Sequence, residues 1–315
     1  MITIVCPERD AVGAQFRAPA IEHRWIEHPA TTQAELVARL AGAQVAIINK
    51  LKLGAAEIAA LPELRMIAVA ATGADNIDLA ACRERGIVVS NVRGYAVDTV
   101  PEHAMMLILA LRRRLLDYVA DVRAGRWARS ENFCFFDHPI GDLAGATLGV
   151  VGRGGLGQGV ARLGEAFGMR VLFAEHRGAT TVREGYTAFE QVLAEADVIS
   201  LHCPLKDNTR GLIGAAELAR MKPTAILVNT SRGGLVDEVA LAEALRAGQI
   251  AGAATDVLST EPPRDGNPLL DADLPNLIVT PHVAWASAQA MQRLADQVID
   301  NIEAFAAGAP RNRLA

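Results

Sequence analysis

Short apolar runs alternate with amphipathic stretches along almost the whole chain. In the first third, apolar runs rich in Val and Ile predict four strands, at Ile2–Val5, Val45–Ile48, Met66–Val69 and Ile87–Ser90. Apolar positions at helical spacing predict helices between these strands, near 32–41, 54–61 and 77–85. Gly86 follows the last of these helices, at a position that favours a left-handed residue. The alternation is typical of parallel sheets that are covered by helices on both faces.

The middle of the chain has a different pattern. A long helix is predicted to begin near Thr99, because Pro101 suits a first helical turn and Glu102 suits the positive end of the helix dipole. Its apolar positions continue as far as Leu115. The segment 130–143 carries aromatic residues without a regular period, so we expect an irregular arm there.

The alternation of strands and helices resumes at Thr147. Six further strands are predicted, at 147–151, 170–174, 198–201, 225–229, 252–256 and 277–280. A long helix at about 286–306 could return to the first domain, which would make that domain discontinuous. A chain of 315 residues is too long for one ordinary core. The sequence therefore predicts an α/β fold with two doubly wound parallel-sheet domains.

Composition and charge narrow the class of function. The chain is 51% hydrophobic and 21% charged, as in globular proteins, and its formal net charge of −5 argues against nucleic acid as a main partner. The apolar stretches are too short for a membrane span, and Met1–Pro7 predicts a first strand instead of a secretory leader. The four cysteines are dispersed and form no C-x-x-C pair, which argues against a zinc site or a disulfide framework. We therefore expect no metal and a reduced, cytoplasmic protein.

A glycine-rich turn follows the first strand of the second half. Gly152 permits a tight turn, Gly154 lets the backbone approach a pyrophosphate, and Gly157 allows the next helix to pack closely on the strand. Gly155 and Leu156 should contribute backbone N–H groups at the helix N-terminus, where the dipole favours phosphate. Because a strand precedes this turn and a helix and a second strand follow it, the unit predicts a nicotinamide dinucleotide site.

The type of dinucleotide depends on the acid that ends the second strand. Glu175 lies about 18 residues past the last glycine of the turn. A carboxylate there can accept both ribose hydroxyls of NAD and would repel a 2′-phosphate. Arg177 follows closely and could pair with a 2′-phosphate if Glu175 turned away. The sequence therefore favours NAD and leaves NADP open.

The later strands of the second half are also followed by residues that could line a ligand site. These residues are His202, Pro204, Thr230, Ser231, Arg232, Asp256, Glu261 and His282. Ligands of an open parallel sheet bind beyond the carboxyl ends of its strands, so we expect these side chains to converge on the edge that carries the glycine turn. The first four are expected to line the cofactor pocket, and the others are candidates for chemistry.

The remaining four residues suit the reduction of a carbonyl group, which needs a hydride and a proton. His282 is the candidate proton donor, because histidine exchanges a proton near neutral pH. Glu261 could orient the imidazole and favour its protonated form. Arg232 offers a rigid fork that can hold a substrate carboxylate and polarise the carbonyl. Asp256 could hydrogen-bond the nicotinamide carboxamide.

Taken together, these motifs resemble the D-isomer-specific 2-hydroxyacid dehydrogenases. The resemblance extends over nearly the whole chain, in order, through Ala71–Asp78, Val100–His103, Val151–Gly157, Asn229–Gly233, Asp256–Val257 with Glu261–Pro262, and Thr280–Ala284. Within the family, Asn49–Lys50, Asn91–Tyr95 and Phe133–Asp137 are similar to the glycerate dehydrogenase, or hydroxypyruvate reductase, branch. The set of motifs is highly specific.

The resemblance implies a site and an organisation. It implies Arg232, Glu261 and His282 as the catalytic trio, in agreement with the argument from strand ends. It implies a Rossmann cofactor domain at 98–286, inserted in a flavodoxin-like substrate domain that is made of 1–97 and 287–315. It also implies a homodimer, formed largely through the cofactor domain.

Further contacts are expected from the resemblance alone. Substrate contacts would come from the backbone of Gly73 and Ala74 and from the region of Lys50, in addition to Arg232. Thr209 would lie near the cofactor. The substrate would be a small 2-keto or 2-hydroxy acid.

Two classes of function are compatible with the sequence. The first is an enzyme that reduces hydroxypyruvate or glyoxylate to D-glycerate or glycolate with NADH, with a general 2-keto acid reductase preferring NADPH as the alternative. The second is a dinucleotide-sensing binding protein that uses the fold to control association with a partner. The intact trio of Arg232, Glu261 and His282 argues against the second class.

Overall fold

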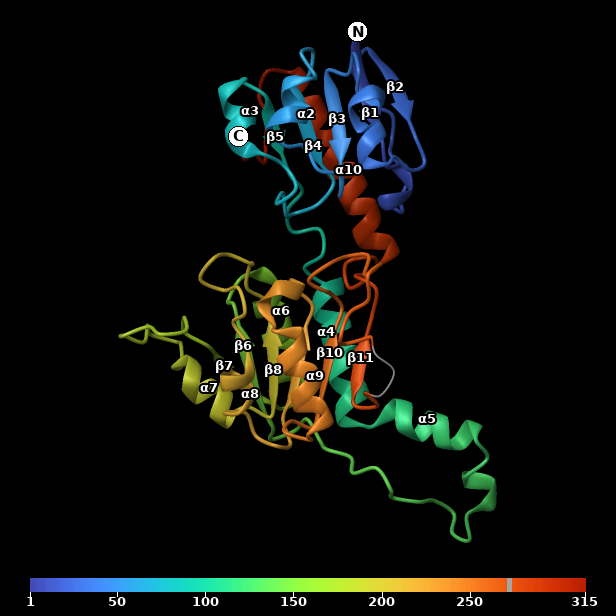
Figure 1. Cartoon of the computed structure of the whole chain (residues 1–315), viewed down its shortest axis with the longest axis vertical. Helices are drawn as coiled ribbons and strands as arrows, with labels where there is room; N and C mark the ends of the chain where they lie inside the picture. Colours follow the sequence, from blue (N-terminus) through green and yellow to red (C-terminus); the bar gives the residue numbers. More distant parts are fainter. Residues whose placement is uncertain (271–273) are drawn as a thin grey trace. The chain divides into compact units, whose positions relative to one another are not determined.

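The chain folds as two compact units. The computed structural model describes residues 1–270 and 274–315, and the units consist of Met1–Ala96 with Ala286–Ala315, and of Val97–Trp285 (Figure 1). Each unit has its own sheet and its own hydrophobic core. Within the described ranges, no helix combines the length and the apolar character that crossing a membrane requires.

The first unit contains a five-stranded parallel sheet. Its strands are β1 (Ile2–Cys6), β2 (His23–Glu27), β3 (Val45–Ile48), β4 (Met66–Val69) and β5 (Val88–Ser90), in the order β2-β1-β3-β4-β5. This order is the flavodoxin-like arrangement. Four strands were predicted within one residue at each end, and β2 was missed. Its sequence has only two apolar residues, Trp25 and Ile26, between polar ones, and it lies at the sheet edge where burial is only partial, so it lacks a continuous apolar run.

Short helices cover one face of this sheet and a long helix covers the other. Apolar side chains of α1 (Leu36–Arg39), α2 (Ala55–Ala59) and α3 (Leu79–Glu84) share one core with β3 and β4. Helix α10 (Ala288–Ala306) contacts β4 and begins after Ser287, whose side chain accepts a hydrogen bond from the Ala290 N–H. The elements η1 (Arg9–Ala11) and η2 (Gln33–Glu35) are single 3₁₀ turns.

The second unit contains a six-stranded parallel sheet. Its strands are β6 (Thr147–Val151), β7 (Arg170–Phe173), β8 (Val198–Leu201), β9 (Ile226–Asn229), β10 (Gly252–Thr255) and β11 (Leu277–Val279), in the order β11-β10-β9-β8-β6-β7. A single parallel bridge between Ala174 and Thr187 adds a rudimentary strand beyond β7. With that bridge as the third strand, the order becomes the Rossmann order 3-2-1-4-5-6 with one strand added. The predicted fold class is confirmed.

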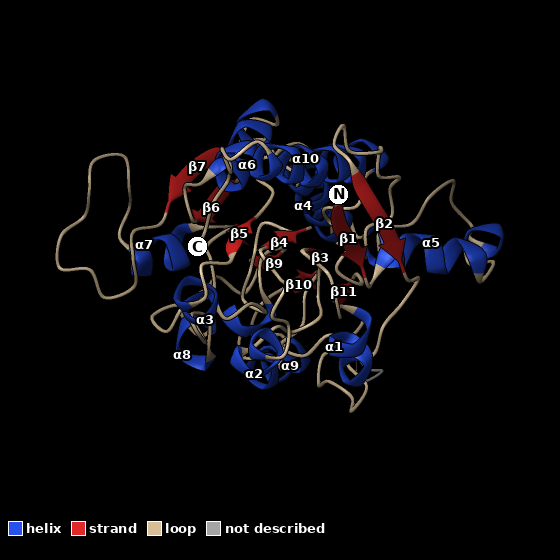
Figure 2. Ribbon diagram, turned by 90° about the horizontal axis from the view of Figure 1, so that it is seen from above, coloured by secondary structure: helices blue, strands red, loops and turns tan. Residues whose placement is uncertain are grey.

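Helices cover both faces of the second sheet (Figure 2). Helices α4 (Thr99–Arg112) and α6 (Gly155–Ala166) pack on each other and share a core with β6 and β9. Residues of α7 (Phe189–Glu195), α8 (Ala215–Leu218) and α9 (Glu238–Arg246) form the core of the opposite face. The single 3₁₀ turns here are η3 (Trp127–Arg129) and η4 (Gly233–Leu235).

The helix predicted to run from Thr99 to Leu115 is in fact two helices. Helix α4 ends at Arg112, and Arg114 has a left-handed backbone with φ of 53° before α5 (Leu115–Arg123) begins. The prediction failed because apolar spacing continues across the break and no glycine or proline marks it. The segment after α5 is irregular, as predicted, apart from η3.

Candidate active site

The glycine-rich turn between β6 and α6 has the geometry that its sequence predicted. Gly152 has a φ of 105°, and a Cβ there would lie 2.6 Å from the backbone of His202. A Cβ on Gly157 would lie 1.9 Å from the carbonyl oxygen of Gly152. Helix α6 begins after Gly154, which has no side chain to cap it, so the N–H groups of its first turn are available to an anion. These features fit the pyrophosphate of a dinucleotide.

A cavity of about 200 Å³ lies beside this turn, beyond the ends of β6 and β7. Gly152, Glu175, Arg183 and Thr209 are among the residues that line it. The Thr209 hydroxyl donates a hydrogen bond of 2.8 Å to the carbonyl of Pro204 and so fixes this part of the wall. Position and size suit the adenosine half of a dinucleotide.

Glu175 lines this cavity, and both oxygens of its carboxylate already accept hydrogen bonds from the protein. The Arg183 guanidinium donates two hydrogen bonds to it, of 2.7 Å from Nε and 2.6 Å from Nη2. The backbone N–H groups of His176 and Arg183 donate two more. The Arg183 side chain and the His176 N–H lower the pKa of Glu175 to about 2. The carboxylate that was predicted to accept the ribose hydroxyls is therefore paired with Arg183 in this structure.

The other predicted cofactor residues lie at the ends of β8 and β9. The His202 ring shares a hydrogen bond of 2.8 Å with the Ser200 hydroxyl through Nε2, and its buried Nδ1 has no partner among the described residues. Burial lowers the pKa of His202 to about 4. The Ser231 hydroxyl donates to the Cys203 carbonyl, which ties these two strand ends together, and the buried Thr230 hydroxyl lacks a partner within the described chain.

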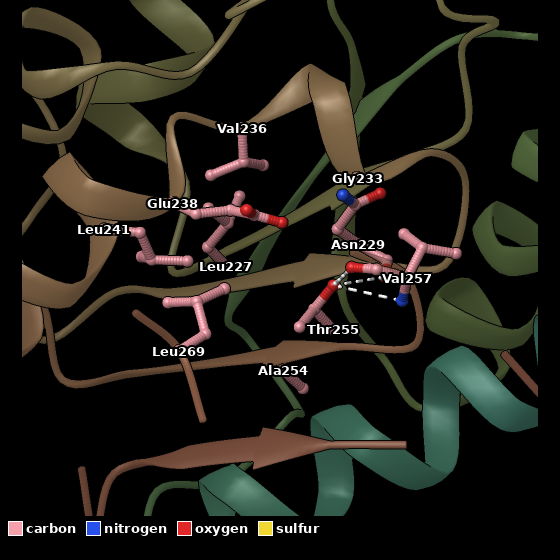
Figure 3. Close-up of a pocket in the computed structure, with 10 residues that line it drawn as sticks. All are labelled: Leu227, Asn229, Gly233, Val236, Glu238, Leu241, Ala254, Thr255, Val257 and Leu269. Atoms are coloured by element: carbon pink, nitrogen blue, oxygen red, sulfur yellow. Dashed lines mark hydrogen bonds between the residues drawn. The ribbon is translucent and has the colours of Figure 1, made fainter. Parts of the chain in front are cut away.

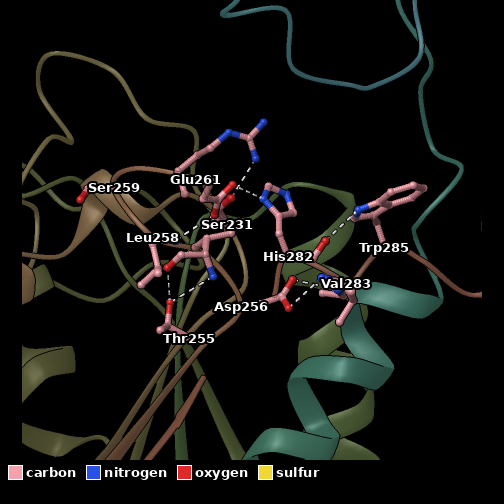
Figure 4. Close-up of polar contacts among 12 residues, drawn as sticks. Ser231, Thr255, Asp256, Leu258, Ser259, Glu261, His282, Val283 and Trp285 are labelled. Atoms are coloured by element: carbon pink, nitrogen blue, oxygen red, sulfur yellow. Dashed lines mark hydrogen bonds and ion pairs between the residues drawn. The ribbon is translucent and has the colours of Figure 1, made fainter. Parts of the chain in front are cut away.

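The two catalytic candidates after β10 and β11 are in contact. His282 Nδ1 lies 2.5 Å from Oε2 of Glu261 (Figure 4). The other carboxylate oxygen of Glu261 accepts the Leu258 N–H at 2.8 Å, so the carboxylate is fixed in place. A carboxylate that is hydrogen-bonded to Nδ1 orients the imidazole and leaves Nε2 available for proton transfer. This arrangement can hold a proton on Nε2 and release it to a bound oxygen.

Asp256 holds the loop that presents His282. Its carboxylate accepts hydrogen bonds from the Thr280 hydroxyl at 2.5 Å and from the backbone N–H groups of Val283 at 2.9 Å and Ala284 at 2.8 Å. The carboxyl group is 1% exposed. His282 itself has a left-handed backbone with φ of 58°, which costs energy for a residue with a Cβ. The Asp256 bonds supply local support for that strained conformation.

Trp285 and His103 reinforce the same loop from two sides. The Trp285 indole donates a hydrogen bond of 2.9 Å to the His282 carbonyl (Figure 4). The His103 ring lies 3.1 Å from the Thr280 hydroxyl, and burial lowers the pKa of His103. The contacts of His103 are thus with Thr280 and Asp256, two residues that position the loop.

Glu238 is a buried acid that sequence reasoning missed. Its carboxylate accepts hydrogen bonds from the Ser259 N–H at 2.7 Å, the Ser259 hydroxyl at 2.6 Å and the Asn267 amide at 2.8 Å. Ser259 belongs to the turn that carries Glu261. A Cβ on Gly233 would lie 1.9 Å from the Leu258 carbonyl carbon, so that turn packs directly on η4. The cavity that Glu238 lines together with residues of β9, β10 and η4 is only about 10 Å³, too small for a ligand (Figure 3).

Arg232 follows β9 at the same edge of the sheet. Its Nη1 donates a hydrogen bond of 2.8 Å to the Ser231 carbonyl, and its own carbonyl accepts one of 2.9 Å from the Asn229 side chain. A separate hollow of about 420 Å³ has Asp256, Glu261 and His282 in its wall, and most of its other lining residues are apolar. Such walls reduce the dielectric constant and strengthen the interactions of nearby charges.

The substrate residues expected from the first unit lie at the carboxyl ends of its own strands. The backbone N–H of Lys50, just past β3, donates to both carboxylate oxygens of Glu8 at 3.0 Å. Glu8 also accepts the N–H groups of Asn49 and Leu51, so one acid organises this turn. Gly73 and Ala74 follow β4. Across the described parts of both units, no three His, Cys, Asp or Glu side chains gather as a metal site would require.

Comparison with known proteins adds independent information. A family model described as "D-isomer specific 2-hydroxyacid dehydrogenase, NAD binding domain" matches residues 105–284. A glycerate dehydrogenase of Methylorubrum extorquens is 51% identical over 310 residues, 98% of both chains. A hydroxypyruvate reductase of Blautia hydrogenotrophica is 34% identical over 285 residues, 90% of this chain and 88% of that protein. The crystal structure of the TT0316 protein of Thermus thermophilus superimposes with a TM-score of 0.86 and 34% identity over the whole of both chains.

Proposed function

We propose, on the premise that this chain belongs to the D-isomer specific 2-hydroxyacid dehydrogenase family, that it reduces hydroxypyruvate, or the close 2-keto acid glyoxylate, to the D-2-hydroxy acid. The chain is an NAD(P)-dependent oxidoreductase of that family, with an NAD-binding domain in its second unit. The observation that carries the proposal is the 2.5 Å contact between His282 and Glu261. The relatives named glycerate dehydrogenase and hydroxypyruvate reductase support the choice of substrate.

The proposed chemistry uses three side chains of the second unit. A bound reduced nicotinamide would supply the hydride that the carbonyl carbon of the substrate accepts. His282 gives the proton on Nε2 to the carbonyl oxygen, and Glu261 stabilises the imidazole in the protonated form from which it donates. Arg232 holds the substrate carboxylate and draws electron density from the carbonyl. In the reverse direction His282 accepts the hydroxyl proton.

The cofactor is proposed to lie along the glycine turn and the ends of β8 and β9. The first turn of α6, with the N–H groups of Gly155, Leu156 and Gly157, would hold the pyrophosphate. The cavity with Glu175 and Thr209 would hold the adenosine. His202, Pro204, Thr230 and Ser231 would border the rest of the dinucleotide, and Asp256, beyond its role in the loop, would approach the nicotinamide amide.

The first unit is proposed to contribute the substrate-binding domain, as 1–97 with 287–315, and the second the cofactor domain, as 98–286. Lys50 and the backbone of Gly73 and Ala74 are the proposed contacts of the first unit with substrate. Their positions after β3 and β4 support this role, because ligands of parallel sheets bind beyond the carboxyl ends of strands.

A homodimer in the cytoplasm is the proposed assembly and location. Phe133 and Phe136, in the segment after α5, are 89% and 83% exposed, and contiguous exposed apolar groups mark interaction sites. Neighbouring Phe135 is held against Arg126, 4.6 Å from its ring centre, so this segment has fixed contacts of its own. All four cysteines are free thiols, which supports a reducing compartment.

Steady-state kinetics with purified protein tests the function. We expect oxidation of NADH with hydroxypyruvate and glyoxylate, with kcat/KM at least about tenfold above that for pyruvate, and D-glycerate as the product from hydroxypyruvate. A preference for larger 2-keto acids with NADPH would favour the general reductase instead. If no 2-keto acid is turned over with either cofactor although the dinucleotide binds, the protein is a dinucleotide-sensing binding protein.

A further inference from the structure

Three arginines and one acid line the cavity beyond β6 and β7. Arg153, Arg177 and Arg183 contribute three positive charges, and Glu175 contributes one negative charge, so these four groups sum to +2. The whole chain, in contrast, has a formal net charge of −5. A pocket with such a local excess of guanidinium groups suits an anion.

Glu175, the acid in this cavity, already accepts hydrogen bonds on both carboxylate oxygens. Glu175 is only 3% exposed, and each of its two oxygens accepts one hydrogen bond from the Arg183 side chain and one from a backbone N–H. The paired guanidinium cancels the charge that would repel a 2′-phosphate. A ribose hydroxyl that sought this carboxylate would compete with four existing donors.

The arginines are oriented by aromatic faces. The Arg183 guanidinium lies 4.1 Å from the ring centre of Tyr186. The Arg153 guanidinium lies 4.8 Å from the ring centre of Phe173 and 5.3 Å from that of Tyr186. Stacking fixes a guanidinium plane while its N–H edge can still donate. Arg177 is held by hydrogen bonds to the carbonyls of Gly211 and Leu212, and its Nη1 lies 3.6 Å from a carboxylate oxygen of Glu217.

We propose that Arg183 determines cofactor specificity: by neutralising Glu175 it allows a phosphate monoester on the adenosine ribose to bind beside Arg153 and Arg177, so that the protein accepts NADP(H) as well as NAD(H). This proposal rests on the proposed function, because it requires a dinucleotide in the cavity. It goes beyond the proposed function because it assigns the choice between NAD(H) and NADP(H) to Arg183, a residue of an irregular segment. Glu175 alone would predict rejection of the 2′-phosphate.

Isothermal titration calorimetry with two probes of the adenosine end tests the proposal without catalysis. 5′-ADP reports the pocket itself, and 2′,5′-ADP adds the phosphate monoester. We expect the wild-type protein to bind 2′,5′-ADP at least as tightly as 5′-ADP. Arg183→Ala should weaken the binding of 2′,5′-ADP by about 10–100-fold, because it leaves Glu175 charged and without its guanidinium partner. The same variant should change the affinity for 5′-ADP by less than about threefold.

Two further variants separate neutralisation from a direct contact or a general charge effect. The double variant Glu175→Gln with Arg183→Ala carries no unpaired acid and should recover most of the binding of 2′,5′-ADP. Arg170→Ala removes an exposed arginine from the opposite end of β7, where it pairs with Glu195, and should leave both probes unchanged.

Each failure has a distinct meaning. Binding of 5′-ADP without 2′,5′-ADP by the wild-type protein, or unchanged binding of 2′,5′-ADP by Arg183→Ala, would overturn the proposal and leave the proposed function intact. A double variant that stays as weak as Arg183→Ala would overturn the neutralising role. If neither probe binds the wild-type protein, the dinucleotide site and the proposed function fail together.

Discussion

At the scale of single residues, His202 is held neutral by its surroundings. Its Nδ1 is buried without a partner in the described chain, and burial lowers the pKa of the ring to about 4. In the unfolded chain the same imidazole has a pKa of about 6.5. The unfolded state therefore binds a proton that the folded state does not bind between these two values.

This difference predicts a pH dependence of stability. The contribution of neutral His202 to the free energy of unfolding should be complete above about pH 6.5, and it should be lost as the pH drops toward about 4. His202→Gln should lose much of this slope, whereas His176→Gln, an exposed histidine of the same unit, should keep it. Urea unfolding between pH 4.5 and 7.5 measures the slopes. An equal slope in wild type and His202→Gln would contradict the prediction.

The sequence predicted residue identities better than residue partners. Arg232, Glu261 and His282 could be proposed from their positions after strands, because parallel strands bring their ends to one edge. Arg183, which neutralises Glu175, lies in the irregular segment between Arg177 and Thr187, where no period indicates a direction for a side chain. Glu238 resembled an ordinary first-turn acid of a helix, and only the folded chain brings Ser259 to it.

At the scale of elements, the site depends on the close approach of η4 and the turn 258–261. Gly233 can accept no side chain there, since a Cβ would lie within 2.3 Å of three backbone atoms of Leu258 and Ser259. A Cβ on neighbouring Gly234 would meet only the ends of the Leu205 and Arg210 side chains, at 3.1 to 3.4 Å. Substitution of Gly234 is therefore a control for substitution of Gly233, because only the methyl group at 233 would clash with backbone atoms.

We expect Gly233→Ala to reduce both activity and stability. The added methyl group should displace Glu261, lower kcat about tenfold or more, and cost about 1–3 kcal/mol of unfolding free energy. Gly234→Ala should change kcat by less than about threefold. Initial rates and urea unfolding of the two variants provide the comparison, and equal activity in both would refute the dependence on this contact.

Most elements followed from periodicity, and the exceptions have physical reasons. Continuous apolar runs identified strands that are buried on both faces, such as β3 and β4. The edge strand β2 was missed because only two of its residues, Trp25 and Ile26, are apolar. The third strand of the second sheet consists of a single bridge at Thr187. The left-handed residue Arg114 breaks a helix at a position that has no sequence signal.

At the scale of the whole molecule, the sequence indicated two parallel-sheet domains and a return of the last helix to the first one. The structure has two such sheets, and α10 packs with the strands of the first unit. The exposed aromatic residues after α5 are not accounted for by either core. They carry the proposal of a homodimer.

The dimer proposal predicts the effect of removing these aromatic groups. Phe133→Ser with Phe136→Ser should weaken self-association at least about tenfold, because two large apolar contacts are lost. Phe167→Ser, which removes another exposed phenylalanine at the end of α6, should leave association unchanged. Sedimentation velocity over a concentration series measures both. A wild-type protein that remains monomeric at all concentrations would rule out the dimer.

A single-turnover measurement of hydride transfer tests whether His282 donates the proton. His282→Gln or wild-type protein is mixed with NADH and then with hydroxypyruvate, and the loss of NADH absorbance is followed. We expect the variant to bind NADH as tightly as wild type and to transfer hydride about 10²–10⁴-fold more slowly, since it lacks the proton on Nε2. A variant that transfers hydride at the wild-type rate would contradict the role of the His282–Glu261 pair.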